Sequence, residues 1–265
     1  MKFFFIRKRW IKPLTVFAAI GAAAAICISM IVSQHSKTVM SPGNDKLPIY
    51  CVATQDKKVA VTFDAAWGSD STEGILELLD EYNTKCTFFL VSYWVDKNEN
   101  LIKTITDRGH EIGSHSSTHP HMSGMSREKT LQELEANRQK ITALSGQPVT
   151  LFRPPFGDYD AKLVQVAKEA GFSTIQWDVD SLDWKGLNAN AILGRVKAKT
   201  GNGSIILFHN NSENILSGLK ATLEYLAAEG YEMVKVSDLI HPDPYTLDHE
   251  GRQHAVSDGP HTAAS

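Results

Sequence analysis

Cysteine is scarce in this sequence, and there is no excess of basic charge. The 265 residues include only three cysteines, of which Cys27 lies within an apolar run. If the protein is exported, a disulfide between Cys51 and Cys86 is one option. The alternative is two separate thiols, with Cys86 buried in a strand. Lysine and arginine number 27 against 30 aspartates and glutamates, a formal net charge of -3. This balance lacks the basic footprint of a nucleic-acid-binding protein, so no nucleic-acid partner is predicted.

Apolar runs of membrane length are absent, with one exception near the N-terminus. Residues 14–32 (LTVFAAIGAAAAICISMIV) carry no charge, and a helix of this length spans nearly the whole hydrocarbon core, ~30 Å. Basic residues precede the run: Lys2, Arg7, Lys8, Arg9 and Lys12. The pattern predicts an N-terminus that stays inside and an exported remainder. Residues 1–34 are interpreted as an uncleaved signal anchor, because the run exceeds a usual signal-peptide core; a cleaved signal peptide is the alternative.

The rest of the chain contains no internal repeat and has an ordinary globular composition, with 42% hydrophobic and 22% charged residues. Residues 35–56 are read as a polar linker that leads to a first strand near 49–53. In the domain at 57–240, strands are predicted at 58–63, 86–90, 111–114, 149–153, 174–177, 204–208 and 231–235. Helices are predicted at 72–82, 99–107, 126–144, 161–170, 189–198 and 215–228, with a short turn at 236–240. Residues 241–265 are predicted to be an irregular tail.

Strands that alternate with helices predict a mostly parallel α/β sheet, and seven or so such units suit a barrel better than an open sheet. Polar side chains follow five of these strands: Asp64, the pair His115 and His119, Arg153, the pair Asp180 and Asp183, and His209. The carboxyl ends of parallel strands meet at one face of a barrel, where active sites are built. Taken alone, each of these polar residues has a plainer explanation, such as a helix cap or a turn former. Together they predict a catalytic site.

His115 and His119 belong to the segment His-Ser-Ser-Thr-His. Spacing of four residues places two imidazoles on the same side of a helical turn, where they can bind one metal ion. A solvated surface pair is the alternative. The metal interpretation is strengthened because the pair begins just past the carboxyl end of the strand at 111–114.

Five segments occur in the order TFDAAW, HSSTH, RPPFG, DSLDW and LFH. They resemble the motifs of the polysaccharide deacetylase family, the NodB-homology domain of carbohydrate esterase family 4, over roughly residues 57–236. The resemblance implies an α/β fold, a distorted (β/α)7-type barrel like those of glycoside hydrolases and deacetylases. It also implies metal-dependent hydrolysis of N-acetyl groups on amino sugars, with release of acetate. The predicted anchor favours cell-wall glycan, N-acetylglucosamine or N-acetylmuramic acid of peptidoglycan; a chitooligosaccharide deacetylase is an alternative.

The resemblance also implies a role for each site residue. Asp64 would be the general base and His209 the general acid, held by Asp183 rather than by Asp180. Arg153 would steady the base. His115 and His119 would bind a divalent metal, with zinc expected. Three aromatic residues would contact the substrate: Trp67, Phe156 and Trp184.

Ala65 departs from the family pattern, in which Thr-Phe-Asp-Asp is usual and the second Asp completes a metal triad. Without it we expect weaker metal binding, with Asp64, Asp70 or His121 as candidate replacements; for His121, a position beyond Pro120 that faces solvent is favoured. The variant resembles a subgroup of membrane-anchored or exported deacetylases, some linked to sporulation in Gram-positive bacteria. A catalytically silent glycan-binding domain is therefore the competing hypothesis. The expected protein is a bacterial monomer, either anchored in the cell membrane with an extracytoplasmic catalytic domain or secreted after cleavage.

Overall fold

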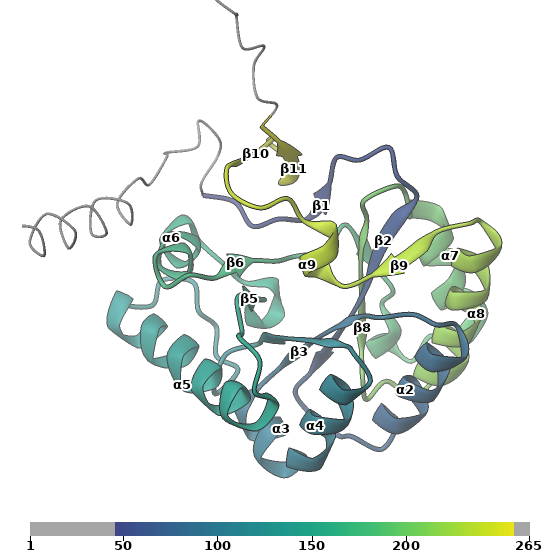
Figure 1. The fold of residues 1–265 in the computed structure, drawn as a ribbon, viewed down its shortest axis with the longest axis horizontal. Coiled ribbons are helices and arrows are strands. Elements are labelled where there is room, and N and C mark those ends of the chain that lie inside the picture. Colours follow the sequence, from purple (N-terminus) through teal and green to yellow (C-terminus); the bar gives the residue numbers. More distant parts are fainter. Residues whose placement is uncertain (1–45, 257–265) are drawn as a thin grey trace, which may run out of the picture. The chain divides into compact units, whose positions relative to one another are not determined.

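A parallel β-sheet forms the centre of the computed structural model, which describes residues 46–256 (Figure 1). Its strands are β2 (Lys58–Ala65), β3 (Thr87–Leu90), β4 (Glu111–Ser114), β5 (Leu151–Phe152), β6 (Ser173–Thr174), β7 (Val179–Asp180), β8 (Ile205–His209) and β9 (Glu232–Val234). Their order is β6-β5-β4-β3-β2-β8-β7, and β9 pairs with the start of β2. Every pair in this sheet is parallel, so the predicted α/β class is confirmed.

Helices connect these strands and lie around the outside of the curled sheet (Figure 1). They are α2 (Thr72–Glu81), α3 (Ser92–Lys97), α4 (Glu99–Asp107), α5 (Arg127–Ser145), α6 (Ala161–Glu169), α7 (Ala189–Lys199), α8 (Ile215–Ala228) and α9 (Val236–Leu239). The Ser126 side chain accepts a hydrogen bond from the Lys129 amide, as an N-cap does. Helix α3 lies in a stretch that the sequence pattern left unassigned.

The sheet curls into a distorted barrel whose edges, β6 and β7, do not pair with each other within residues 46–256. The segment that contains β1 (Cys51–Val52) links the two sides instead. The Ile49 amide donates to Thr174 O at 2.9 Å, and the Val52 amide donates to Gly203 O at 2.9 Å. Gly203 has φ +79°, and a Cβ there would lie 1.9 Å from Val52 O. Only glycine fits this close approach.

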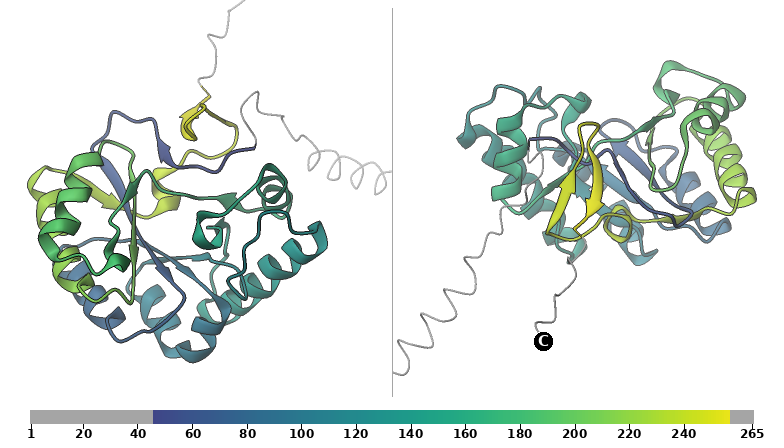
Figure 2. Two further views of the ribbon diagram at one scale, coloured as in Figure 1. Left: turned by 180° about the vertical axis from the view of Figure 1, so that it is seen from behind. Right: turned by 90° about the horizontal axis from the view of Figure 1, so that it is seen from above.

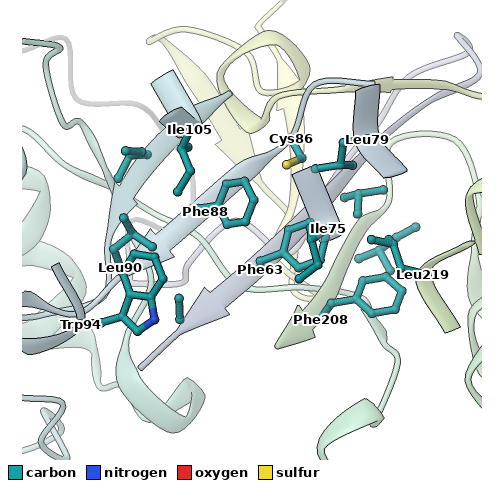
Figure 3. Close-up of a cluster of buried hydrophobic side chains, with 14 of the residues drawn as sticks. Phe63, Ile75, Leu79, Cys86, Phe88, Leu90, Trp94, Ile105, Phe208 and Leu219 are labelled. Carbon is teal, nitrogen blue, oxygen red and sulfur yellow. The ribbon is translucent and has the colours of Figure 1, made fainter. Parts of the chain in front are cut away.

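Buried side chains alternate between the two faces of β2. Val59, Val61 and Phe63 face the helices and join a large hydrophobic cluster with residues of α2, α4 and α8 (Figure 3). Ala60 belongs to a second, smaller cluster inside the barrel, together with Phe89 and Ile205. Thr62 and Asp64 share this inner face, and the polar site begins where this inner cluster ends.

The prediction of an irregular tail is wrong for residues 245–255. Strands β10 (Tyr245–Leu247) and β11 (Arg252–Ala255) form an antiparallel hairpin, and β11 pairs with β1 in parallel (Figure 2). The buried Gln253 side chain accepts from the His241 amide at 2.7 Å and donates to the His241 carbonyl at 2.9 Å. Strand β11 pairs with β1, which lies at the start of the domain, and residues 252–255 show no alternation of apolar and polar side chains. For these two reasons the sequence pattern did not indicate a strand.

Two further predictions concern the thiols and the membrane. Cys51 and Cys86 are both buried free thiols, so the disulfide that the sequence allowed does not form.

Residues 14–32, the predicted anchor, lie outside the described part of the chain. Within residues 46–256 no helix has the length and apolar character needed to cross a membrane.

Candidate active site

A cavity of about 500 Å³ opens at the carboxyl ends of the parallel strands. Seven of the predicted site residues line it: Asp64, Trp67, His115, His119, Phe156, Trp184 and His209. Arg153 and Asp183 are fully buried and contact Asp64 and His209 respectively. The remaining lining residues are Ala66, Gly157, Trp177, Asp180, Leu207 and Asn211. The predicted residues are therefore brought together, whereas Asp70 is exposed and does not line the cavity.

Asp64 and His209 are neighbours because β2 and β8 pair in register at these two residues. Asp64 is 7% exposed, and its Oδ1 accepts from Arg153 Nη1 at 2.8 Å. Burial favours the neutral acid, but the charges of Arg153 and His209 lower the pKa of Asp64 below its usual value. The carboxylate is thus held in its charged form.

Arg153 is fixed from several sides. Its Nη1 also donates to Thr62 Oγ1 at 2.9 Å, and its Nη2 donates to Gln176 O at 3.0 Å. The guanidinium lies 4.1 Å from the centre of the Phe89 ring. A buried arginine with this planar support presents a rigid donor to its carboxylate partner. Arg153 consequently sets the orientation of Asp64.

His209 is held by Asp183, which the sequence favoured over Asp180. The His209 amide donates to Asp183 Oδ2 at 2.7 Å, and Nδ1 lies 2.9 Å from Oδ1. Burial of the ring opposes protonation, but the hydrogen bond and charge of Asp183 raise the pKa of His209 above its ordinary value of 6.5. With Nδ1 engaged by Asp183, Nε2 is the nitrogen left to meet a ligand in the cavity.

The two predicted metal ligands lie close together, but not on a helical turn as expected. Ser116 and His119 have φ of +69° and +56°, so the segment is a loop. The two ring centroids are 5.0 Å apart. The Ser116 hydroxyl accepts from the His119 amide at 3.0 Å, and the Glu133 carboxylate of α5 accepts from the Ser117 and Thr118 amides. These local bonds, rather than helical geometry, bring the imidazoles together.

Both imidazoles are suited to metal binding. His115 Nδ1 lies 2.8 Å from Arg153 O and is the donor there, which leaves a lone pair on Nε2, 3.6 Å from Asp64 Oδ2. Burial lowers the pKa of His119 to about 4 and also lowers the pKa of His115, so both rings are neutral near pH 7. Within residues 46–256, however, no group of three or more His, Cys, Asp or Glu residues has the arrangement of a metal site. Two nitrogen donors are in place, and residue 65 supplies no carboxylate beside them.

Comparison with known proteins identifies the family. Residues 52–175 match the family model for polysaccharide deacetylase. A peptidoglycan-N-acetylglucosamine deacetylase of Bacillus cereus is 32% identical over 194 residues, which cover 71% of this chain and 91% of that protein. The chain belongs to the polysaccharide deacetylase family. The family member PgdA of Listeria monocytogenes, a peptidoglycan-N-acetylglucosamine deacetylase, is 34% identical over 75% of this chain and 42% of its own length. The chain thus spans less than half of that relative.

A solved family structure adds a contrast. BA3943 of Bacillus anthracis, described as a CE4 family pseudoenzyme, superposes with a TM-score of 0.70 at 34% identity, covering 73% of this chain and 69% of that one. A mutant of BA3943 is described as having restored enzymatic activity. These structures confirm the barrel that the five motifs implied for this family member.

Proposed function

We propose that the domain hydrolyses N-acetyl groups of amino sugars in cell-wall peptidoglycan and releases acetate. The observation that carries the proposal is the pairing of Asp64 with His209 across adjacent strands of one cavity, each with its own oppositely charged partner. A base that is charged and an acid that is protonated near neutral pH are what amide hydrolysis needs. The named activity of the peptidoglycan deacetylase relatives supports this substrate class.

Each residue has a defined task in this reaction. Asp64, oriented by Arg153, takes a proton from water as the water oxygen bonds to the acetyl carbon. His209, oriented by Asp183, gives a proton to the sugar nitrogen as the carbon–nitrogen bond breaks, which leaves acetate and a free amine. Trp67, Phe156 and Trp184, each 57% exposed, surround the cavity and offer apolar faces to the sugar.

We further propose that His115 and His119 hold a divalent metal, with zinc as the expected ion. When bound, the metal supplies a Lewis acid that polarises the acetyl carbonyl. The pair fits such an ion through its neutral nitrogens, and Asp64 Oδ2 or water is left to complete the coordination.

A silent glycan-binding domain is the second candidate, and Ala65 favours it. Where the family usually has a carboxylate, Ala65 is fully buried in the hydrophobic cluster. The similar BA3943 is described as a pseudoenzyme. In this alternative the aromatic residues bind glycan and no acetate is released.

Acetate release separates the two candidates. Purified protein with added zinc is incubated with peptidoglycan and with chitooligosaccharides, and free acetate is measured. We expect release from peptidoglycan, and a loss of about 10²–10⁴-fold in His209→Ala. Glycan binding without acetate release, from any substrate and at any zinc concentration, would establish the silent domain. Release from chitooligosaccharides alone would move the substrate class away from the cell wall.

We also propose that the domain works outside the cytoplasm, held at the membrane by residues 14–32. The basic residues before this uncharged run support the orientation, and a peptidoglycan substrate is consistent with it.

A further inference from the structure

Phe156 has a backbone conformation that costs energy for a residue with a side chain. It lies in a short 3-10 turn, Pro155–Gly157, with φ +60° and ψ +6°. Such left-handed conformations persist only when surrounding contacts enforce them, and they gather at ligand sites. The Phe156 ring lines the cavity although it is 57% exposed, so burial alone does not hold it in place.

The backbone beyond Phe156 is fixed from inside the barrel. Gln176 Nε2 donates to Gly157 O at 2.9 Å. Gly157 has φ +68°, and a Cβ there would lie 3.0 Å from the Trp177 ring. These contacts place the turn but do not touch the Phe156 ring.

The ring is held from the solvent side by His121. The two rings are stacked, with centroids 4.4 Å apart and planes 21° apart. His121 Nδ1 lies 3.2 Å from Asp158 Oδ2, which also accepts from the Ser123 amide at 3.4 Å. On its other side the Phe156 ring meets His119 edge-to-face, with centroids 4.4 Å apart. The ring is therefore clamped between two imidazoles.

We propose that His121 and Asp158 are positioning residues that hold the Phe156 ring as a wall of the cavity, against which the apolar face of an N-acetylated sugar packs. The inference rests on the proposed function and deepens it. Without His121, the Phe156 side chain can leave the cavity, and the bound sugar loses a preorganised apolar surface. The clamp acts on substrate binding more than on the chemical step.

This arrangement also assigns His121 a role other than that of a replacement metal ligand. Its side chain is 73% exposed, it does not line the cavity, and its Nδ1 is engaged by Asp158. A metal ligand would instead present a nitrogen to the space beside His115 and His119.

The test compares His121→Ala, His121→Phe and His121→Asn. Binding of an N-acetylglucosamine tetramer is measured by calorimetry in an Asp64→Asn background, so that turnover does not interfere, and zinc content is measured in each protein. His121→Ala should weaken binding about two- to tenfold, the size of an aromatic pair contact. His121→Phe should restore most of it by stacking, and His121→Asn should not. Zinc content should match that of the parent in all three.

With Asp64 intact, His121→Ala should raise KM and leave kcat within about twofold. His249→Ala is the matched control, because His249 is 89% exposed and lies outside the cavity. Unchanged tetramer binding in His121→Ala, rescue by Asn but not by Phe, or loss of zinc in His121→Ala would each overturn the proposal. Tetramer binding is read without turnover, so a wild-type protein that releases no acetate would defeat the proposed reaction while leaving the clamp testable.

Discussion

At the scale of single residues, the two buried carboxylates of the site have partners of different kinds. Asp64 is stabilised by the permanent positive charge of Arg153, whereas Asp183 is paired with His209, whose charge depends on pH. The first arrangement keeps a base ready at all working pH values. The second makes the acid the group that limits activity on the alkaline side.

The pH dependence of the reaction follows from these pairs. The raised pKa of His209 means that the ring keeps its proton above pH 6.5, and activity should fall only as pH rises through that higher value. Asp183→Asn removes the charge that raises the pKa, while burial, which lowers it, remains. We therefore expect the alkaline limb of kcat to move to lower pH. The pH profile of acetate release measures this, with Asp180→Asn as the comparison, since Asp180 adds a lesser charge effect. An unmoved limb in Asp183→Asn would remove His209 as the acid.

Ala65 is the residue at which the metal site differs from the family pattern. It is fully buried with Phe63, Leu90 and Trp94 in the large hydrophobic cluster between β2 and the helices. Ala65→Asp should lower the melting temperature of the metal-free protein, because an unpaired carboxylate is costly to bury. Ala65 faces the helix side of β2 and does not line the cavity, so the new carboxylate reaches the two imidazoles only if the end of β2 turns when zinc binds. In that case the same variant should gain more thermal stability from zinc than wild type does.

Ala65→Asn serves as the matched control for this prediction, since it has similar volume without the charge. It should lose stability and gain nothing extra from zinc. If zinc raises the melting temperature of Ala65→Asp no more than that of wild type, the metal is held by other ligands in this protein.

At the scale of elements, strands position the charged groups and loops position the imidazoles and aromatic rings. Asp64 and His209 each end an apolar run, so the sequence predicted both at the carboxyl ends of strands on one face. The structure adds that β2 and β8 are neighbours and pair in register at these two residues. The left-handed residues Ser116 and Phe156, and the support of Glu133 from α5, depend on contacts between distant segments. No periodicity reports such contacts, and the helical turn predicted for His115 and His119 was wrong for this reason.

An element-level prediction concerns Gly113 in β4. A Cβ there would lie 2.6 Å from the Phe89 ring, on which the Arg153 guanidinium rests. Gly113→Ala should destabilise the fold by about 1–3 kcal/mol through overpacking and lower kcat by disturbing Arg153 and Asp64. Gly194→Ala in α7 is the control, because a Cβ there meets nothing within 4 Å. It should stabilise the helix by about 0.5–1 kcal/mol. Equal melting temperatures and kcat in the two variants would contradict the packing argument.

At the scale of the whole molecule, residues far apart in sequence close the barrel. The amides of the segment 49–53 donate to Thr174, to Gly203 and to Gln253 of the C-terminal hairpin. Alternating strands and helices predicted the barrel class. They did not predict that a short segment, paired with a hairpin, would connect β6 to the start of β8, since each of these elements is too short to show a pattern.

Removal of residues 1–34 should therefore give a folded, soluble domain. Both hydrophobic clusters and the cavity are built from residues beyond Pro48, and the deletion takes away the apolar run at 14–32. Removal of residues 1–56 should be far more damaging, because it also takes away β1 and the bonds from Ile49 and Val52 that connect the two sides of the sheet.

Thermal unfolding and flotation with lipid vesicles, applied to both truncated proteins and to the full chain, measure these outcomes. We expect the full chain to float, and the protein lacking residues 1–34 to stay in solution and melt cooperatively. Flotation of that shorter protein would mean that the membrane contact is made by the domain itself.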